Sequence, residues 1–253
     1  SSYPHEILHN WWGNSVFVDY ATGNWCEGLT AYMADHLFKE QIGEGTAFRR
    51  DTLKRYRDYV KEGHDFPLTE FRSRHSAATE AVGYGKTMMG FHMLRRKFGD
   101  DTFRKALQDF YRAERGERAG FMDVKRVFAK TGGVNLDAFF DQWVNRAGAA
   151  DLRLEKVRHE GQRVHGVIRQ VQKSGLLALD VPVSVRTASG YVSQTVALAG
   201  ATTPFEIVVG SAPLLVELDP EFDVFRLLDP RETAPSIGQV FGDPSVLAIL
   251  PAA

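Results

Sequence analysis

Two histidines and a glutamate near the start of the chain have the types and spacing of a metal site. His5 and His9 enclose Glu6 in a His-Glu-x-x-His pattern. On a helix, residues four apart lie on one face, about 6 Å apart along the axis, so the two imidazoles can hold one ion. Glu6 is turned roughly 100° from His5, too far to complete a tetrahedron but close enough to reach a water on the ion. The pattern predicts zinc ligands at His5 and His9 and a general base at Glu6.

A third ligand must come from elsewhere, because a catalytic zinc takes three protein ligands and keeps its fourth position for water. Glu27 is the best candidate, and it would complete a site for one Zn²⁺ per chain. Cys26 could be interpreted as a fourth ligand or a nucleophile. Neighbouring residues on a helix point about 100° apart, which favours a buried packing role for this thiol.

The residues around these positions resemble a known family. His9 is followed by Asn-Trp-Trp-Gly-Asn, and Glu27 lies in Trp-Cys-Glu-Gly-Leu-Thr-Ala-Tyr. Both stretches resemble the gluzincin metallopeptidases of the aminopeptidase N family, which also includes bifunctional epoxide hydrolases. The family usually places eighteen residues between the second histidine and the glutamate, whereas the segment 10–26 has seventeen. A connection one residue shorter within 19–24 absorbs the difference without moving either helix.

A tyrosine further along the chain completes the resemblance. In the family, a Tyr-x-Lys-Gly segment opens a helix, and its tyrosine hydroxyl donates a hydrogen bond to the oxyanion of the reaction. Tyr84 and Lys86 match this segment, although Thr87 replaces the glycine. A phenol suits the role, because it donates a hydrogen bond while remaining neutral near pH 7. The alternative is a core tyrosine between flexible glycines, and the match favours a catalytic Tyr84.

Hydrophobic periodicity predicts helices first and strands second. We expect helices at 5–17, 25–39 with Asn24 as the N-cap, 46–63 as a solvated amphipathic helix, 101–113, 122–130 and 136–145. Short apolar runs then predict the strands of a small antiparallel β-sandwich, at 152–157, 164–168, 177–185, 192–198, 205–209, 214–218 and 225–228. A last apolar run, 246–251, suggests that another module follows.

The fold class expected is multidomain α+β. Residues 1–150 form a mainly helical, thermolysin-like zinc-peptidase catalytic subdomain, and residues 151–230 form the β-sandwich. Residues 231–253 are a linker or the start of a further module. The resembled family also carries a small β-sandwich directly after its helical domain, which supports the boundary near residue 150.

Composition excludes several function classes. A net charge of −1 gives no electrostatic case for nucleic acid, and no run of apolar residues is long enough to span a bilayer. The single cysteine excludes an internal disulfide framework, but it does not decide between the cytoplasm and an exported location.

The start of the chain suggests that part of a longer protein precedes it. The sequence begins Ser-Ser-Tyr, without Met, and enters the metal motif at once. In the resembled family, a large β domain and a Gly-x-Met-Glu-Asn segment, whose glutamate holds the substrate's free amine, come before this point. We therefore expect missing N-terminal domains, and we expect residues 1–253 alone to be a weakly active or inactive peptidase.

The resemblance implies a zinc metallopeptidase, an aminopeptidase that hydrolyses N-terminal residues of peptide substrates. Two alternatives stay open. The first is an epoxide hydrolase that uses the same zinc site. The second is a non-catalytic, zinc-stabilised scaffold module, although a structural site has no use for Glu6 or Tyr84 and is usually closed by a fourth ligand.

Overall fold

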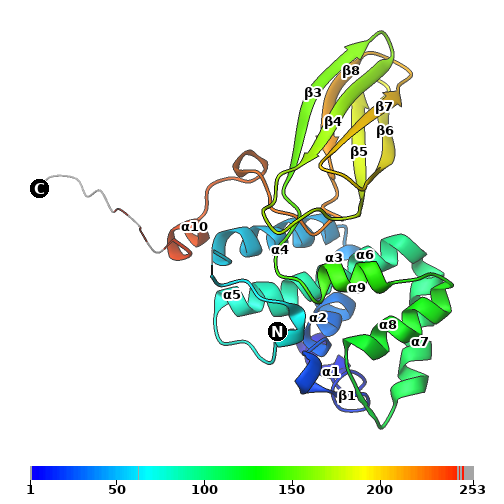
Figure 1. Cartoon of the computed structure of the whole chain (residues 1–253), viewed down its shortest axis with the longest axis vertical. Coiled ribbons are helices and arrows are strands. Elements are labelled where there is room, and N and C mark those ends of the chain that lie inside the picture. Colours follow the sequence, from blue (N-terminus) through cyan, green and yellow to red (C-terminus); the bar gives the residue numbers. More distant parts are fainter. Residues whose placement is uncertain (1, 62, 244, 246, 248–253) are drawn as a thin grey trace, which may run out of the picture.

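The computed structural model describes residues 2–61, 63–243, 245 and 247 of the chain. Helices form the lower part in Figure 1, and two antiparallel β-sheets stand above them. The predicted α+β class is confirmed. Of the last predicted apolar run, 246–251, only Leu247 is among the described residues. None of the helices in the described residues combines the length and the apolar character that a membrane crossing requires.

The first helix is shorter than predicted. Helix α1 (Tyr3–Leu8) ends before His9, so the prediction of one helix over 5–17 is wrong. The chain turns at Gly13, whose φ of +108° is a conformation that a side chain would disfavour. It then forms the two-residue strand β1 (Phe17–Val18), which pairs in parallel with β2 (Arg118–Ala119).

The second helical segment contains a π turn. Helix α2 (Cys26–Ala31), the π turn η2 (Tyr32–His36) and α3 (Leu37–Gln41) follow one another without a break, where the sequence predicts a plain helix. Asn24 lies one residue before the N-cap, and its side-chain oxygen accepts a hydrogen bond from the backbone of Cys26 at 3.1 Å. Wider π turns are rare and occur often at functional sites.

The remaining helices surround these elements. They are α4 (Gly45–Tyr59), α5 (Ala77–Glu80), a second π turn η4 (Ala81–Lys86), α6 (Thr87–Phe98), α7 (Asp100–Glu114), α8 (Phe121–Gly132) and α9 (Asp137–Trp143). One-turn 3₁₀ helices lie at η1 (Tyr20–Thr22) and η3 (Leu68–Glu70). The predicted solvated helix over 46–63 corresponds to α4, but its Arg49 and Asp58 are buried, so the prediction that it is a solvated helix is wrong for this face.

The two sheets have three strands each in the described residues. One has the order β3 (Leu152–Glu160), β4 (Arg163–Gln170), β7 (Thr202–Val208), and the other has the order β6 (Gly190–Leu198), β5 (Leu179–Thr187), β8 (Pro213–Leu218). Alternate residues are buried, as in Val181, Val183 and Val185 of β5, because successive side chains in a strand point to opposite faces.

The segment after β8 returns to the helical part. We call residues 219–232 the exit segment. The predicted strand at 225–228 does not form there, and the backbone makes only an isolated bridge between Ala150 and Arg226. The exit segment ends in the 3₁₀ turn η5 (Pro230–Glu232), and α10 (Ile237–Phe241) then lies against α4. A buried ion pair between Arg226 and Asp219, 2.8 Å long, fixes the irregular path.

Candidate metal centre

Helix α1 and the turn after it present both histidines of the motif. Ser2 caps the helix by accepting a hydrogen bond from the His5 backbone N–H. His5 lies inside the helix, and His9 forms its C-cap, one turn further on. The two imidazole rings therefore lie edge to face, with centroids 4.9 Å apart.

Glu27 enters from the first turn of α2 and joins the two histidines. Its Oε2 atom lies 3.4 Å from Nε2 of His5 and 3.6 Å from Nε2 of His9. Ligand atoms from all three residues lie within 4.8 Å of one another. Four ligands at 2.0–2.1 Å from a zinc ion are about 3.3 Å apart in a tetrahedron. The two distances from Glu27 to the histidines are therefore close to the spacing of ligands around a tetrahedral metal ion.

The other nitrogen of each histidine is held by a hydrogen bond. His5 donates from Nδ1 to Asp35 at 2.8 Å, and His9 donates from Nδ1 to the backbone carbonyl of Trp12 at 3.0 Å. Such bonds fix the tautomer and the ring orientation of a metal-binding histidine. As a result, both Nε2 atoms face Glu27.

Asp35 is a site residue that the sequence prediction missed. It lies in the π turn η2, eight residues after Glu27, and also accepts a hydrogen bond from Ser2. The available signal was a carboxylate two turns after Glu27 on the same predicted segment. In a regular α-helix these two residues would be rotated by roughly 80° from each other, and the wider π turn changes that angle.

The carboxylates around His5 dominate the electrostatics of the site. Burial lowers the pKa of His5, but the hydrogen bonds with Asp35 and Glu27 outweigh it and raise the pKa to about 9. Burial opposes the ionisation of Glu27, yet His5, Tyr84 and His9 hold its pKa below the usual value. The cluster therefore favours a positive charge at its centre.

The three donors open into a cavity of about 510 Å³. The exposed Glu6 and the half-buried Tyr84 line the same cavity. The structure thus brings together all five residues predicted from the sequence, His5, Glu6, His9, Glu27 and Tyr84. A carboxylate, a phenol and a metal-binding set in one cavity can perform acid–base chemistry on a water and a polar substrate.

Tyr84 is positioned by the second π turn, η4. Its ring stacks on His5 with centroids 6.2 Å apart and packs against Phe71. Burial and the neighbouring Glu27 raise the pKa of Tyr84, so its hydroxyl keeps its proton near neutrality. Lys86, which matches the same family segment, points away from this chemistry and donates to the carbonyl of Arg146 at 2.6 Å.

Cys26 packs against His9 on the side of its Nδ1 atom. Its thiol is buried and donates to the carbonyl of Trp12 at 3.0 Å, and its sulfur lies 3.4 Å from Nδ1 of His9. Burial raises the pKa of this thiol to about 12. It remains a neutral thiol on the side of His9 remote from Nε2, as its predicted packing role requires.

Two histidines, one in α1 and one at its C-cap, together with a glutamate from α2 make the His₂Glu ligand set typical of zinc-dependent peptidases. The family model described as "Peptidase family M1 domain" matches residues 3–143, which are more than half of the 253 residues. The chain belongs to peptidase family M1.

Individual relatives agree with this family. Aminopeptidase N of Lactococcus lactis subsp. lactis is 23% identical over 60% of this chain and 19% of its own length. Aminopeptidase M1-B of Oryza sativa subsp. japonica is 25% identical over 57% of this chain and 17% of its own length. The chain thus spans about a fifth of the length of these curated relatives.

A solved structure shares the fold over nearly the whole chain. The crystal structure of Legionella pneumophila aminopeptidase A in complex with aspartic acid has a TM-score of 0.69 and 19% sequence identity. The match covers 93% of this chain and 27% of that chain. The arrangement of the helical part and the two sheets is therefore shared with an aminopeptidase structure.

Proposed function

We propose that this chain carries the zinc centre of a metallopeptidase, an aminopeptidase acting on peptide substrates. The observation that carries the proposal is the convergence of His5, His9 and Glu27 in the same cavity as Glu6 and Tyr84. His5, His9 and Glu27 would hold one Zn²⁺. When bound, the ion supplies a Lewis acid and lowers the pKa of water at the site.

The side chains of this chain then divide the work. Glu6 takes the proton from the attacking water and later passes it to the leaving amine, so one carboxylate acts as base and then as acid. The Tyr84 hydroxyl donates a hydrogen bond to the oxyanion, where charge develops in the transition state. Asp35 and the carbonyl of Trp12 keep the imidazoles oriented.

The division into units also stays a proposal. We place the catalytic subdomain at 1–150, the sandwich at 151–230 and a linker or further module at 231–253. The helices up to Trp143 and the strands from Leu152 onward support the first boundary.

The substitution Glu6→Gln tests the proposed function. In the gene's intact product, hydrolysis of an aminoacyl anilide should fall roughly 10²- to 10⁴-fold, because the general base is lost, while bound zinc stays at one per chain. Glu44→Gln, which changes an exposed carboxylate outside this cavity, is the matched control and should keep the activity. An active Glu6→Gln enzyme with intact zinc would exclude this role.

The same preparation separates the alternatives. An epoxide assay run beside the anilide assay tests the epoxide hydrolase alternative. A zinc-loaded intact protein that turns over neither substrate would instead support the scaffold alternative. In the described residues the metal group contains three donor residues, which favours an open fourth position and hence catalysis.

A further inference from the structure

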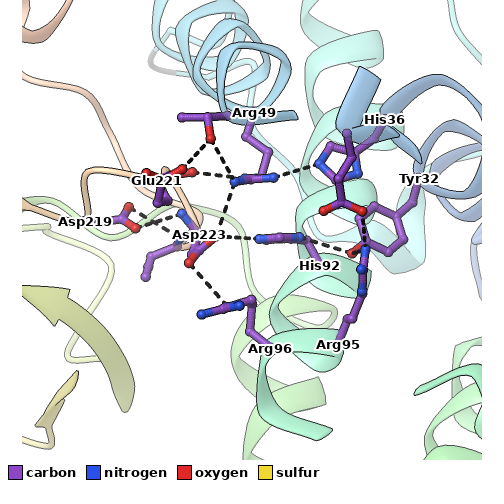
Figure 2. A network of polar contacts seen from close by, with 12 residues as sticks. Tyr32, His36, Arg49, His92, Arg95, Arg96, Asp219, Glu221 and Asp223 are labelled. Carbon is purple, nitrogen blue, oxygen red and sulfur yellow. Dashed lines mark hydrogen bonds and ion pairs between the residues drawn. The ribbon is translucent and has the colours of Figure 1, made fainter. Parts of the chain in front are cut away.

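A buried polar network joins the exit segment to the π turn η2. Figure 2 shows it between α4, α6 and the loop around Asp223. His36 is fully buried, and His92 and Asp223 are 2% and 9% exposed. Most buried polar groups form hydrogen bonds, so the hydrogen bonds and ion pairs of these side chains help to fix the surrounding backbone.

One arm of the network leads from Asp223 to the start of the π turn. Asp223 accepts a hydrogen bond from Nε2 of His92 at 2.7 Å, and Nδ1 of His92 lies 3.1 Å from the Tyr32 hydroxyl. Burial disfavours the ionised form of Asp223, but His92 holds its pKa below the usual value. With Asp223 ionised and Nε2 of His92 as donor, Nδ1 accepts the proton of Tyr32.

The other arm leads from Asp223 to the end of the same turn. Arg49 lies with Nη2 3.5 Å from Asp223, and its Nη1 donates to Nε2 of His36 at 2.8 Å. Arginine carries donors only, so His36 must be the acceptor. Arg49 also donates to the backbone carbonyl of Glu221 at 3.0 Å, which ties α4 to the exit segment.

Asp223 therefore reaches both end residues of η2 through one intermediate side chain each. Tyr32 and His36 also stack on each other, with ring centroids 4.9 Å apart. Asp35, which holds His5 at 2.8 Å, is part of this same five-residue turn. A change in the geometry of the turn would move the carboxylate that orients His5.

We infer that Asp223, in the exit segment of the β-sandwich, is a positioning residue for His5 and acts through the π turn η2 and Asp35. The inference rests on the proposed function, because it treats His5 as a zinc ligand. Through this network, the exit segment of the sandwich helps to orient His5 and so affects metal binding. If the sandwich were only a spacer, changes in the exit segment would leave metal binding unaffected.

The test measures zinc affinity and does not depend on peptidase activity. Zinc dissociation constants of the full 253-residue chain are determined by competition with a chromophoric chelator. Asp223→Ala should weaken zinc binding roughly threefold to thirtyfold, the range expected for a residue coupled to a site without touching the ligand. Hydrogen exchange of the backbone amides in 32–36 should become faster in the same variant.

Glu232→Ala is the matched control. Like Asp223, Glu232 lies in the exit segment and pairs with a buried arginine, Arg226, at 2.8 Å, but among the described residues it makes no hydrogen bond or ion pair with η2. It should leave the zinc dissociation constant unchanged. Tyr32→Phe removes only the hydroxyl that bonds to His92. Its zinc dissociation constant tests the same inference if Asp223→Ala does not fold.

A double variant separates positioning from general destabilisation. In an Asp35→Asn background, Asp223→Ala should add little further loss of zinc affinity, because its effect passes through Asp35. Equal losses with and without Asp35, or a loss no larger than that of Glu232→Ala, would overturn the inference. A wild-type chain that binds zinc while Asp223→Ala and Tyr32→Phe change nothing refutes this inference alone. A wild-type chain that binds no zinc refutes the proposed function as well.

Discussion

The metal centre and the Asp223 network are both built from two histidines and carboxylates, but their charges are balanced differently. In the network, Arg49 and Arg96 pair with Asp223 at 3.5 Å and 3.3 Å. At the metal centre, the ion pairs of Glu27 in the described residues are with the two histidines alone. The network contains its own cations, whereas the metal centre draws a positive charge onto His5, whose pKa is raised to about 9.

The difference separates a network that pairs its own charges from a set of donors that could hold an ion. In the network, the side chains of Tyr32, His36 and His92 are all buried away from solvent. The donors of the metal centre face a cavity of about 510 Å³. Zinc would supply the missing charge at the centre, and no ion is needed in the network.

Removing the ligand His9 should destroy the metal centre and leave the Asp223 network intact. His9→Ala leaves two protein ligands, so zinc affinity should fall by more than the roughly hundredfold loss that changes outside the ligand set reach. Equilibrium dialysis followed by metal analysis measures it. The matched control is His159→Ala, because His159 is exposed on β3. A loss of zinc affinity in this control as large as that in His9→Ala would contradict a specific role for His9.

Removing the carboxylate that links the two regions should have a smaller effect. Asp35→Asn keeps the size of the side chain but weakens the hydrogen bond to His5, and zinc affinity should fall roughly 10- to 100-fold. Chelator competition gives the value. Asp141→Asn, at an exposed position on α9, should change nothing. Equal affinities for the Asp35 variant and the wild type would show that His5 needs no outer partner.

The packing behind Glu27 should tolerate no added methyl group. A Cβ on Gly28 would lie 2.3 Å from Cβ of Thr87, at the contact between α2 and α6. Gly28→Ala should therefore lower the free energy of unfolding by about 1–3 kcal/mol, measured by urea denaturation. Adding Thr87→Gly, which restores the space, should recover part of the loss. A Gly28→Ala variant as stable as the wild type would contradict this packing.

The network should lose stability in acid through His36. Burial, then the charges of His92, Arg49 and Arg95, lower the pKa of His36 to about 3, while Asp223 opposes them. The unfolded chain, with a pKa near 6.5, binds the proton first. The contribution of neutral His36 to the free energy of unfolding is therefore fully present above pH 6.5. It falls as the pH drops toward 3, by up to about 1.4 kcal/mol per pH unit.

Urea unfolding across this pH range, with EDTA present, measures the slope. His36→Gln cannot take up the proton, so its stability should change less with pH than that of the wild type. Parallel pH profiles for the two proteins would show that His36 is not the group responsible.

The grouping of His5, Glu6 and His9 was predictable because it rests on short-range geometry. His5 and His9 lie on adjacent turns whatever happens after Leu8, so the error in the helix end did not matter. The shorter connection before Glu27 runs through η1 (Tyr20–Thr22), and Glu27 still reaches both imidazoles. Local spacing along α1 and its C-cap determined the positions of His5, Glu6 and His9.

The π turns, the buried partner of Arg49 and the path of the exit segment were not predictable from local sequence patterns. The π turns η2 and η4 span only five and six residues, too few for the apolar pattern to reveal the wider turn, so the sequence predicts plain helices there. The sequence favours a solvated helix over 46–63 because charged residues on a helix are usually exposed. Asp223, the partner of the buried Arg49, lies far along the chain. The apolar run 225–228 resembles a strand, but long-range contacts hold it as an irregular segment.

The proposed zinc site, with His5, His9 and Glu27 as ligands and an open fourth position, can be tested by X-ray absorption at the zinc edge on the full chain loaded with one equivalent of zinc. We expect only nitrogen and oxygen neighbours at about 2.0–2.2 Å, with two imidazoles among them. A sulfur neighbour at about 2.3 Å, which would place Cys26 on the metal, or a single imidazole would contradict it.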